Sequence, residues 1–76
     1  MQTKFKRHQK IKILAAPDPE YVEYHDEENT PKIEKGMLGT INILLPNVHY
    51  HVAILDKKGN IIAYAPFAEE ELQAAE

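Results

Sequence analysis

Short runs of β-branched and aliphatic residues, ended by proline, asparagine or glycine, restrict most strongly how this chain can fold. Such runs occupy residues 10–15, 40–45, 48–55 and 61–65. Valine, isoleucine, threonine and tyrosine are enriched in strands, and turn signals about every 8 to 12 residues are typical of an all-β sandwich or barrel. A chain of 76 residues forms one domain, so we predict an all-β fold, a small five-stranded SH3-like barrel.

The strand predictions rest on alternation of side chains. Ile11 and Ile13 alternate with lysines, which predicts a short strand with one buried face that ends before Pro17. Residues 21–24 predict a second extended segment. In residues 48–55 the even positions form one face and the odd positions the other, so the even positions, which include two valines, are expected to face the core.

The segments between these runs carry turn signals. Residues 25–35 are charged and lack a periodic apolar pattern, which predicts a long surface loop. Residues 46–47 and 56–60 predict turns. Pro66 is predicted to close the strand before it. Residues 68–75 favour one or two helical turns, or a 3₁₀ turn that leads into a last strand pairing.

Gly36 and Gly39 bracket Met37 and Leu38 where the most apolar part of the chain begins. Glycine adopts positive φ without the steric penalty of a Cβ atom, so both glycines are predicted to form a tight structural turn before the strand. A phosphate-binding loop is disfavoured, because GMLG lacks the longer glycine spacing and the Lys-Ser/Thr pair of a P-loop.

The charged residues are distributed unevenly. Five of the nine basic residues lie in the first twelve positions, and none of the twelve acidic residues does. We predict that residues 1–9 form a flexible basic arm and that residues 10–76 form the single barrel domain. A basic arm on an acidic body favours an acidic partner, whereas a domain this acidic is a poor candidate for wrapping nucleic acid.

The chain has no cysteine and a small core, so we expect apolar packing or a partner subunit to stabilise it. No run approaches the roughly 18 apolar residues of a membrane span. The basic start is not followed by the apolar stretch of a signal peptide. These features predict a cytoplasmic protein that does not enter a membrane.

Histidines and carboxylates are the candidates for chemistry. His49 and His51 would lie on one face of a strand and, with His25, could form a three-histidine zinc site. No acid or cysteine at ligand spacing joins them, so no metal is predicted. The acidic runs at 26–28 and 69–71 are predicted to be solvated surface. Because serine and cysteine are both missing as nucleophiles, we predict a non-enzyme that needs no cofactor.

The aromatic residues divide into core and surface. Tyr50 and Phe67 are predicted to be buried, since a core without tryptophan needs these rings. Tyr21 and Tyr24 are predicted to be partly exposed. Loops on a rigid scaffold usually carry recognition. The residues predicted to bind a partner are therefore Tyr21, Tyr24, His25, His49 and His51.

The stretches IKILAAPDPEYVEYH, KGMLGTI, YHVAIL and AYAPFAEEEL resemble the variable subunit of ferredoxin:thioredoxin reductase. The resemblance covers most of residues 10–73, although the hairpin DKKGNII is longer and more polar than in that family. It implies an SH3-like barrel that serves as a non-catalytic accessory subunit. It also implies a larger, redox-active partner, because in that reductase the iron–sulfur cluster belongs to the other chain.

The same glycine turn is similar to that of other small barrels. Ribosome-associated KOW modules share it, which leaves a nucleic-acid-binding or ribosome-associated barrel as an alternative that would use the basic arm. A stand-alone barrel of unassigned role is the remaining alternative.

Overall fold

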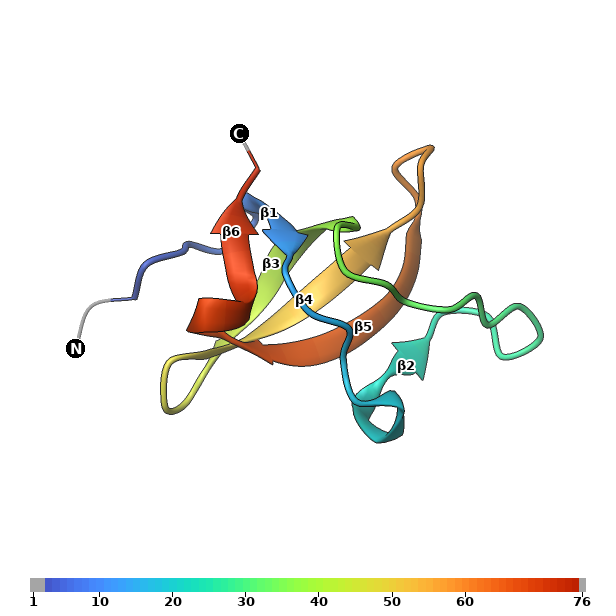
Figure 1. Cartoon of the computed structure of the whole chain (residues 1–76), viewed down its shortest axis with the longest axis horizontal. Coiled ribbons are helices and arrows are strands. Elements are labelled where there is room, and N and C mark those ends of the chain that lie inside the picture. The colour runs from blue at the N-terminus through green and yellow to red at the C-terminus, as the bar shows by residue number, and fades with distance from the viewer. Residues whose placement is uncertain (1–2, 76) are drawn as a thin grey trace.

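The computed structural model describes residues 3–75 (Figure 1). These residues form one antiparallel sheet of six strands in the order β2-β5-β4-β3-β1-β6. The strands are β1 (Lys10–Ile13), β2 (Glu23–Tyr24), β3 (Leu38–Leu45), β4 (His49–Leu55), β5 (Ile61–Ala68) and β6 (Leu72–Ala74). Two 3₁₀ turns, η1 (Pro19–Tyr21) and η2 (Glu69–Glu71), precede β2 and β6.

The elements confirm the predicted all-β class and the predicted 3₁₀ turn near the C-terminus, which is η2. The long strands β3, β4 and β5 form a meander, and β1 lies between β3 and β6. The last strand therefore pairs with the first, directly after a 3₁₀ turn, as in an SH3-like barrel. The sheet is nevertheless open, because β2 and β6 form its two ends. The sheet has six strands because the 3₁₀ turn leads into a last pairing, that of β6 with β1, which was one of the alternatives for residues 68–75.

The core lies on the inner face of the sheet. Alternate residues of the long strands are buried there, so the predicted alternation in β4 is confirmed for Tyr50, Val52 and Ile54. Burial of Tyr50 and Phe67 is confirmed as well. The side chains with 1% exposure or less that fill this core are Phe5, Ile11, Ile13, Ile41, Tyr50, Val52, Ile54, Ala63, Ala65 and Phe67.

The predicted end of β5 at Pro66 is wrong. The strand continues to Ala68, and Pro66 lies opposite His51. On its other side β5 pairs with β2 only at residues 63–64. Pro66 therefore lies where β5 has a single neighbour, a position at which a strand tolerates a missing N–H group.

The predicted placement of Val48 in a strand is also wrong. Asn47 and Val48 have φ angles of 61° and 57°, and β4 begins only at His49. The turn at residues 46–47 is confirmed, but three residues connect Leu45 to His49. Because a β-branched side chain is a steric outlier at positive φ, Val48 stores strain that the flanking strand pairing holds in place.

The two glycines before and within β3 have different roles. Gly36 has a φ of 94° and lies in the predicted turn. Gly39 does not have positive φ and lies inside β3, so its assignment to the turn is wrong. A Cβ atom at Gly39 would lie 2.6 Å from the carbonyl oxygen of Ala53. Close approach of two strands is therefore the reason for glycine at this position.

Residues 3–9, the described part of the predicted basic arm, pack against the rest of the domain. Phe5 is 1% exposed and packs edge-to-face on Tyr50, with ring centroids 5.5 Å apart. Residues 8–9 and Ile41 exchange two backbone hydrogen bonds, of 2.7 and 3.0 Å. The segment before β1 thus belongs to the domain, because a buried aromatic ring anchors it. The first two residues of the arm lie outside the described residues.

The hydroxyl group of Tyr50 joins this segment to η2. It accepts the N–H groups of Lys4 and Phe5, at 3.1 and 3.2 Å, and donates to Oε2 of Glu69. Glu69 also accepts the N–H group of Lys4 at 2.8 Å. Burial and then the bond to Glu69 raise the pKa of Tyr50. The hydrogen bonds from Tyr50 and Lys4 lower the pKa of Glu69 below its ordinary value of 4.5.

The depressed pKa of Glu69 makes stability depend on pH. A carboxyl group whose pKa falls on folding stabilises the folded state above its unfolded pKa, and this contribution is lost as pH falls through the folded pKa. We expect the free energy of unfolding to fall with pH below the ordinary value of 4.5, and to fall less in Glu69→Gln. Urea unfolding from about pH 3 to 7 measures this difference. The exposed neighbour Glu70, changed to glutamine, is the control, and equal pH slopes in Glu69→Gln and the unmodified chain would contradict the assignment.

Candidate functional site

The residues predicted to bind a partner do not form one surface. Tyr24 lies opposite Ala63 on the inner side of the sheet, and its hydroxyl donates to the carbonyl oxygen of Pro31 at 2.7 Å. His51 lies opposite Pro66. Positions 63 and 66 of β5 point to opposite faces, because successive strand side chains alternate. A single partner surface made of the loop and the histidines is therefore not assembled.

The three other predicted residues are dispersed. Tyr21 is 61% exposed at the end of η1. His25 follows β2, and its N–H group donates to the carbonyl oxygen of Ile62 at 2.9 Å. His49 is exposed, with Nδ1 2.8 Å from the carbonyl oxygen of Asn47. Within residues 3–75 no group of three or more histidine or acidic side chains is placed to hold a metal ion. A role in binding stays a prediction for each of these residues.

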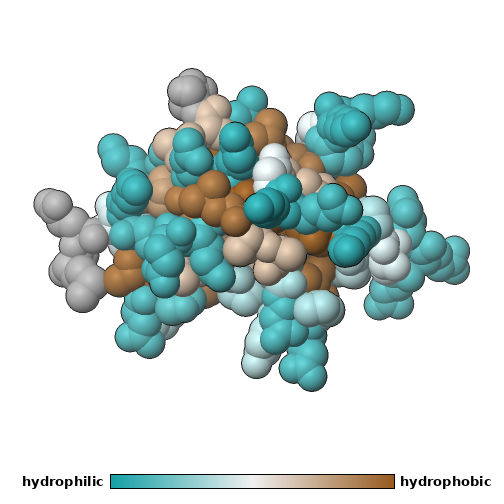
Figure 2. Space-filling view, in the orientation of Figure 1, coloured by the Kyte–Doolittle hydropathy of each residue, from teal (hydrophilic) through white to brown (hydrophobic). Residues whose placement is uncertain are grey.

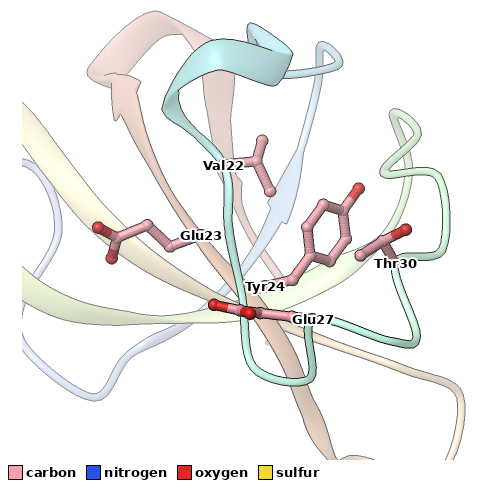
Figure 3. Close-up of a pocket in the computed structure, with 5 residues that line it drawn as sticks. All are labelled: Val22, Glu23, Tyr24, Glu27 and Thr30. Carbon is pink, nitrogen blue, oxygen red and sulfur yellow. The ribbon is translucent and has the colours of Figure 1, made fainter.

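A shallow hollow lies between β2 and the loop that follows it (Figure 3). Its lining consists of Val22, Glu23, Tyr24, Glu27 and Thr30. Figure 3 shows Glu23 and Tyr24 leaving the ribbon in opposite directions, as alternation requires. Two carboxylates and two hydroxyl groups on an open loop surface define no particular ligand, so this hollow supports no specific chemistry.

A row of apolar side chains crosses the outer face at one end of the three long strands. Leu55 pairs with Ile61, which is 39% exposed. Leu38 is 46% exposed. Gly39 lies opposite Ile54 in the antiparallel pair of β3 and β4, so the residue before Gly39, Leu38, is next to the residue after Ile54, Leu55. We call Leu38, Leu55 and Ile61, together with Met37, which packs against the core beside them, the apolar rim. The space-filling view shows apolar residues that reach the surface in patches between hydrophilic ones (Figure 2).

The apolar rim borders a hollow. Met37, Leu38 and Leu55 line it together with Gly36, and its polar edge consists of Glu34, Asp56 and Lys57. The carboxylate of Asp56 is engaged by the hairpin, because its Oδ1 accepts backbone N–H groups at 2.8 and 2.9 Å. These bonds, the one from Asn60 first, lower the pKa of Asp56.

Sequence reasoning missed the apolar rim, although it contained one signal. Leu38 has the same parity as Thr40 and the opposite parity to the buried Ile41, so alternation places it on the outer face. The neighbours of Leu38 could not be found in this way. The contact with Leu55 follows from the pairing register of β3 with β4, which alternation within one strand does not determine.

A second cluster occupies the middle of the outer face. The rings of His51 and Tyr64 are stacked, with centroids 5.4 Å apart and 9° between the planes. The amide nitrogen of Asn42 lies 3.0 Å from Nδ1 of His51. Because an amide nitrogen can only donate, Nδ1 accepts this bond and the proton of the neutral ring is on Nε2. We call Asn42, His51 and Tyr64 the aromatic face.

The chain matches no protein-family model, no curated protein and no solved structure. Among the described residues, no helix has the length and apolar character that crossing a membrane requires. The apolar rim and the aromatic face are therefore the features on which a function can be argued.

Proposed function

We propose that this chain is a non-catalytic interaction subunit that docks on a larger protein through the apolar rim. The observation that supports this proposal is the contiguous row of Leu38, Leu55 and Ile61 beside an apolar hollow. Single exposed apolar residues are common on protein surfaces, whereas grouped ones at a concave site are typical of an interface. A partner side chain that fills the hollow would remove these leucines from water.

The surroundings of the rim fit the same role. Lys12 is paired with Leu38 across β1 and β3, and Lys57 lies at the edge of the hollow. An apolar centre inside a charged border is the usual anatomy of a protein interface. The charged border would steer association and select partners, and the leucines would supply most of the affinity.

The non-catalytic part of the proposal rests on composition. The chain contains neither serine nor cysteine, the usual nucleophiles of acyl transfer. Its acidic runs at 26–28 and 69–71 lie in a loop and in η2, where Glu69 is bound to Tyr50. These carboxylates have structural partners or face solvent, so they serve the fold and its solubility.

The resemblance to the variable subunit of ferredoxin:thioredoxin reductase gives this proposal its specific form. The partner would be a cytoplasmic, redox-active protein that carries an iron–sulfur cluster. The complex is purified and analysed for iron and acid-labile sulfide. This measurement tests whether the partner carries an iron–sulfur cluster, separately from whether the chain docks on a partner at all. A complex without iron would contradict the redox form and leave the interaction role in place.

Docking is tested by Leu38→Asp. We expect at least a 30-fold loss of affinity for the captured partner, which corresponds to about 2 kcal/mol for a residue at the centre of an interface. Ile43→Asp is the matched control, because Ile43 is 48% exposed on the same strand but lies at its other end. The immobilised chain is incubated with host lysate, and the retained protein is then purified for titration against each variant.

Two outcomes would contradict the docking proposal. One is equal retention of the partner by Leu38→Asp and Ile43→Asp. The other is a chain that is dimeric in light scattering and becomes monomeric in Leu38→Asp, since a second copy would then cover the rim.

A further inference from the structure

The outer face has a charge distribution that the composition of the chain conceals. The sequence carries a net charge of −3, but β1, β3, β4 and β5 contain no acidic residue. The acidic residues of the described part lie in β2, in both 3₁₀ turns and in the connecting loops. Strands β1, β3, β4 and β5 therefore carry no carboxylate of their own, although Glu23 of β2 lies opposite Tyr64 at the edge of the face that they form.

Three cations border this face. Ile11 and Ile13 of β1 are buried, so Lys10 and Lys12, which alternate with them, lie on the outer side. Arg7 is exposed, and its Nε donates to the carbonyl oxygen of Asn42 at 3.2 Å, which places the guanidinium group beside the aromatic face. The strand order puts these cations on one side and Tyr64 on the other, with β3 and β4 between them.

Four residues that are successive cross-strand partners connect the cations to the aromatic pair. Lys10 lies opposite Thr40, Thr40 opposite Ala53, and Ala53 opposite Tyr64. Neighbouring strands are about 4.8 Å apart, so this row measures about 14 Å. Ala53 at its centre contributes only a methyl group, which its neighbours leave 3% exposed.

The stacked pair is not part of the core. Both rings are half-buried on the outer side, and Asn42 holds the His51 ring in one tautomer with its Nε2 proton free to donate. Stacked, polar-edged rings beside cations are a surface on which an unpaired base can stack while phosphates meet positive charge. A paired base offers no such face, because its neighbours in the duplex already cover it.

We propose that this face binds single-stranded nucleic acid, with a base stacked on the pair of His51 and Tyr64 and phosphates held by Arg7, Lys10 and Lys12. Arg7, Lys10 and Lys12, which lie on the side of the face away from Glu23, supply the charge complementarity, and the rings supply the sequence-tolerant stacking. This site shares Lys12 with the border of the apolar rim, but its stacking pair lies outside the rim, and it does not depend on the protein partner proposed above.

The test measures binding of fluorescein-labelled oligo(U) RNA and oligo(dT) DNA, each of about twelve nucleotides, by fluorescence anisotropy with the full chain. Three phosphate contacts predict a slope of about −2 in log K against log salt, hence about a 20-fold loss of affinity from 50 to 200 mM salt. RNA and DNA are compared under equal conditions, and tighter binding of RNA would assign the site to a strand with 2′-hydroxyl groups.

Three variants assign the binding to this face. Tyr64→Leu keeps a strand-compatible apolar side chain and should weaken binding about 10-fold without changing the salt slope. Lys10→Gln should reduce that slope by about 0.7. Tyr21→Leu, which changes a 61% exposed tyrosine in η1, should bind like the unmodified chain. Thermal unfolding of each variant confirms that it is folded.

Any of three results would overturn the proposal. The first is no saturable binding of either oligonucleotide at 50 mM salt. The second is equal affinity of folded Tyr64→Leu and the unmodified chain. The third is displacement of the oligonucleotide by poly-glutamate at equal charge concentration, because the face would then recognise acidic polymers, proteins included, without stacking.

Discussion

Replacing Gly39 by valine is expected to destabilise the domain by at least about 3 kcal/mol. A Cβ atom at this position would lie 2.6 Å from the carbonyl oxygen of Ala53 and 3.0 Å from Cγ1 of Val52. The first contact is with backbone of the neighbouring strand, which cannot rotate away as a side chain would. Strand β3 is paired with β1 on one side and with β4 on the other, so it cannot shift to relieve the clash.

The size of this effect follows from the small stability of such a domain. A chain of 76 residues has a free energy of unfolding of about 4 to 11 kcal/mol. Overpacking a core typically costs about 1 to 3 kcal/mol, and the two γ-methyl groups of valine add to a clash that the Cβ atom alone already makes. We expect a loss of at least about 3 kcal/mol, with Gly39→Ala less affected but still destabilised.

Gly36→Ala is the matched control for this prediction. Gly36 has positive φ but nothing within 4 Å of the added atom, so the substitution meets backbone strain and no clash. It should cost about 1 kcal/mol and leave a cooperative unfolding transition. Urea unfolding followed by circular dichroism measures the three variants. A Gly39→Ala variant as stable as the unmodified chain would show that β3 and β4 are not held this closely.

Local patterns predicted the fold class because each strand carries its own period. The alternation in residues 48–55 identified the buried face of β4, and turn residues marked both ends of the 56–60 hairpin. Errors occurred where the outcome depended on a partner strand. Pro66 stays in β5 because no strand pairs with it on the side away from β4, and Gly39 is required by the close approach of Ala53.

The candidate sites were harder to predict for the same reason. His51 was correctly placed on the face opposite Tyr50, but its stacking partner Tyr64 comes from the register of β4 with β5. In the apolar rim, Leu38 and Leu55 are seventeen positions apart and meet only through the bulged pairing of β3 with β4. Surfaces that assemble across strands need a register, and a single sequence specifies register only weakly.

Replacing Phe5 by alanine is expected to cost about 3 to 5 kcal/mol, the usual effect of removing a buried aromatic ring. The ring is 1% exposed and packs edge-to-face on Tyr50. The N–H group of Phe5 also donates to the Tyr50 hydroxyl at 3.2 Å, so a displaced segment would leave that hydroxyl with fewer partners. Tyr21→Ala, which removes a 61% exposed ring, is the control and should change stability by less than about 0.5 kcal/mol.

The composition of the first nine residues does not indicate that Phe5 stabilises the domain. Lys4, Lys6 and Arg7 surround a single phenylalanine, so the segment has the charge of a solvated tail although one of its rings completes the core. If Phe5→Ala and a chain that starts at residue 10 both lose stability in urea unfolding, the basic residues are fixed on the domain surface. If both variants unfold like the unmodified chain, the segment is a free arm, and its charges act on partners at long range rather than from a fixed position.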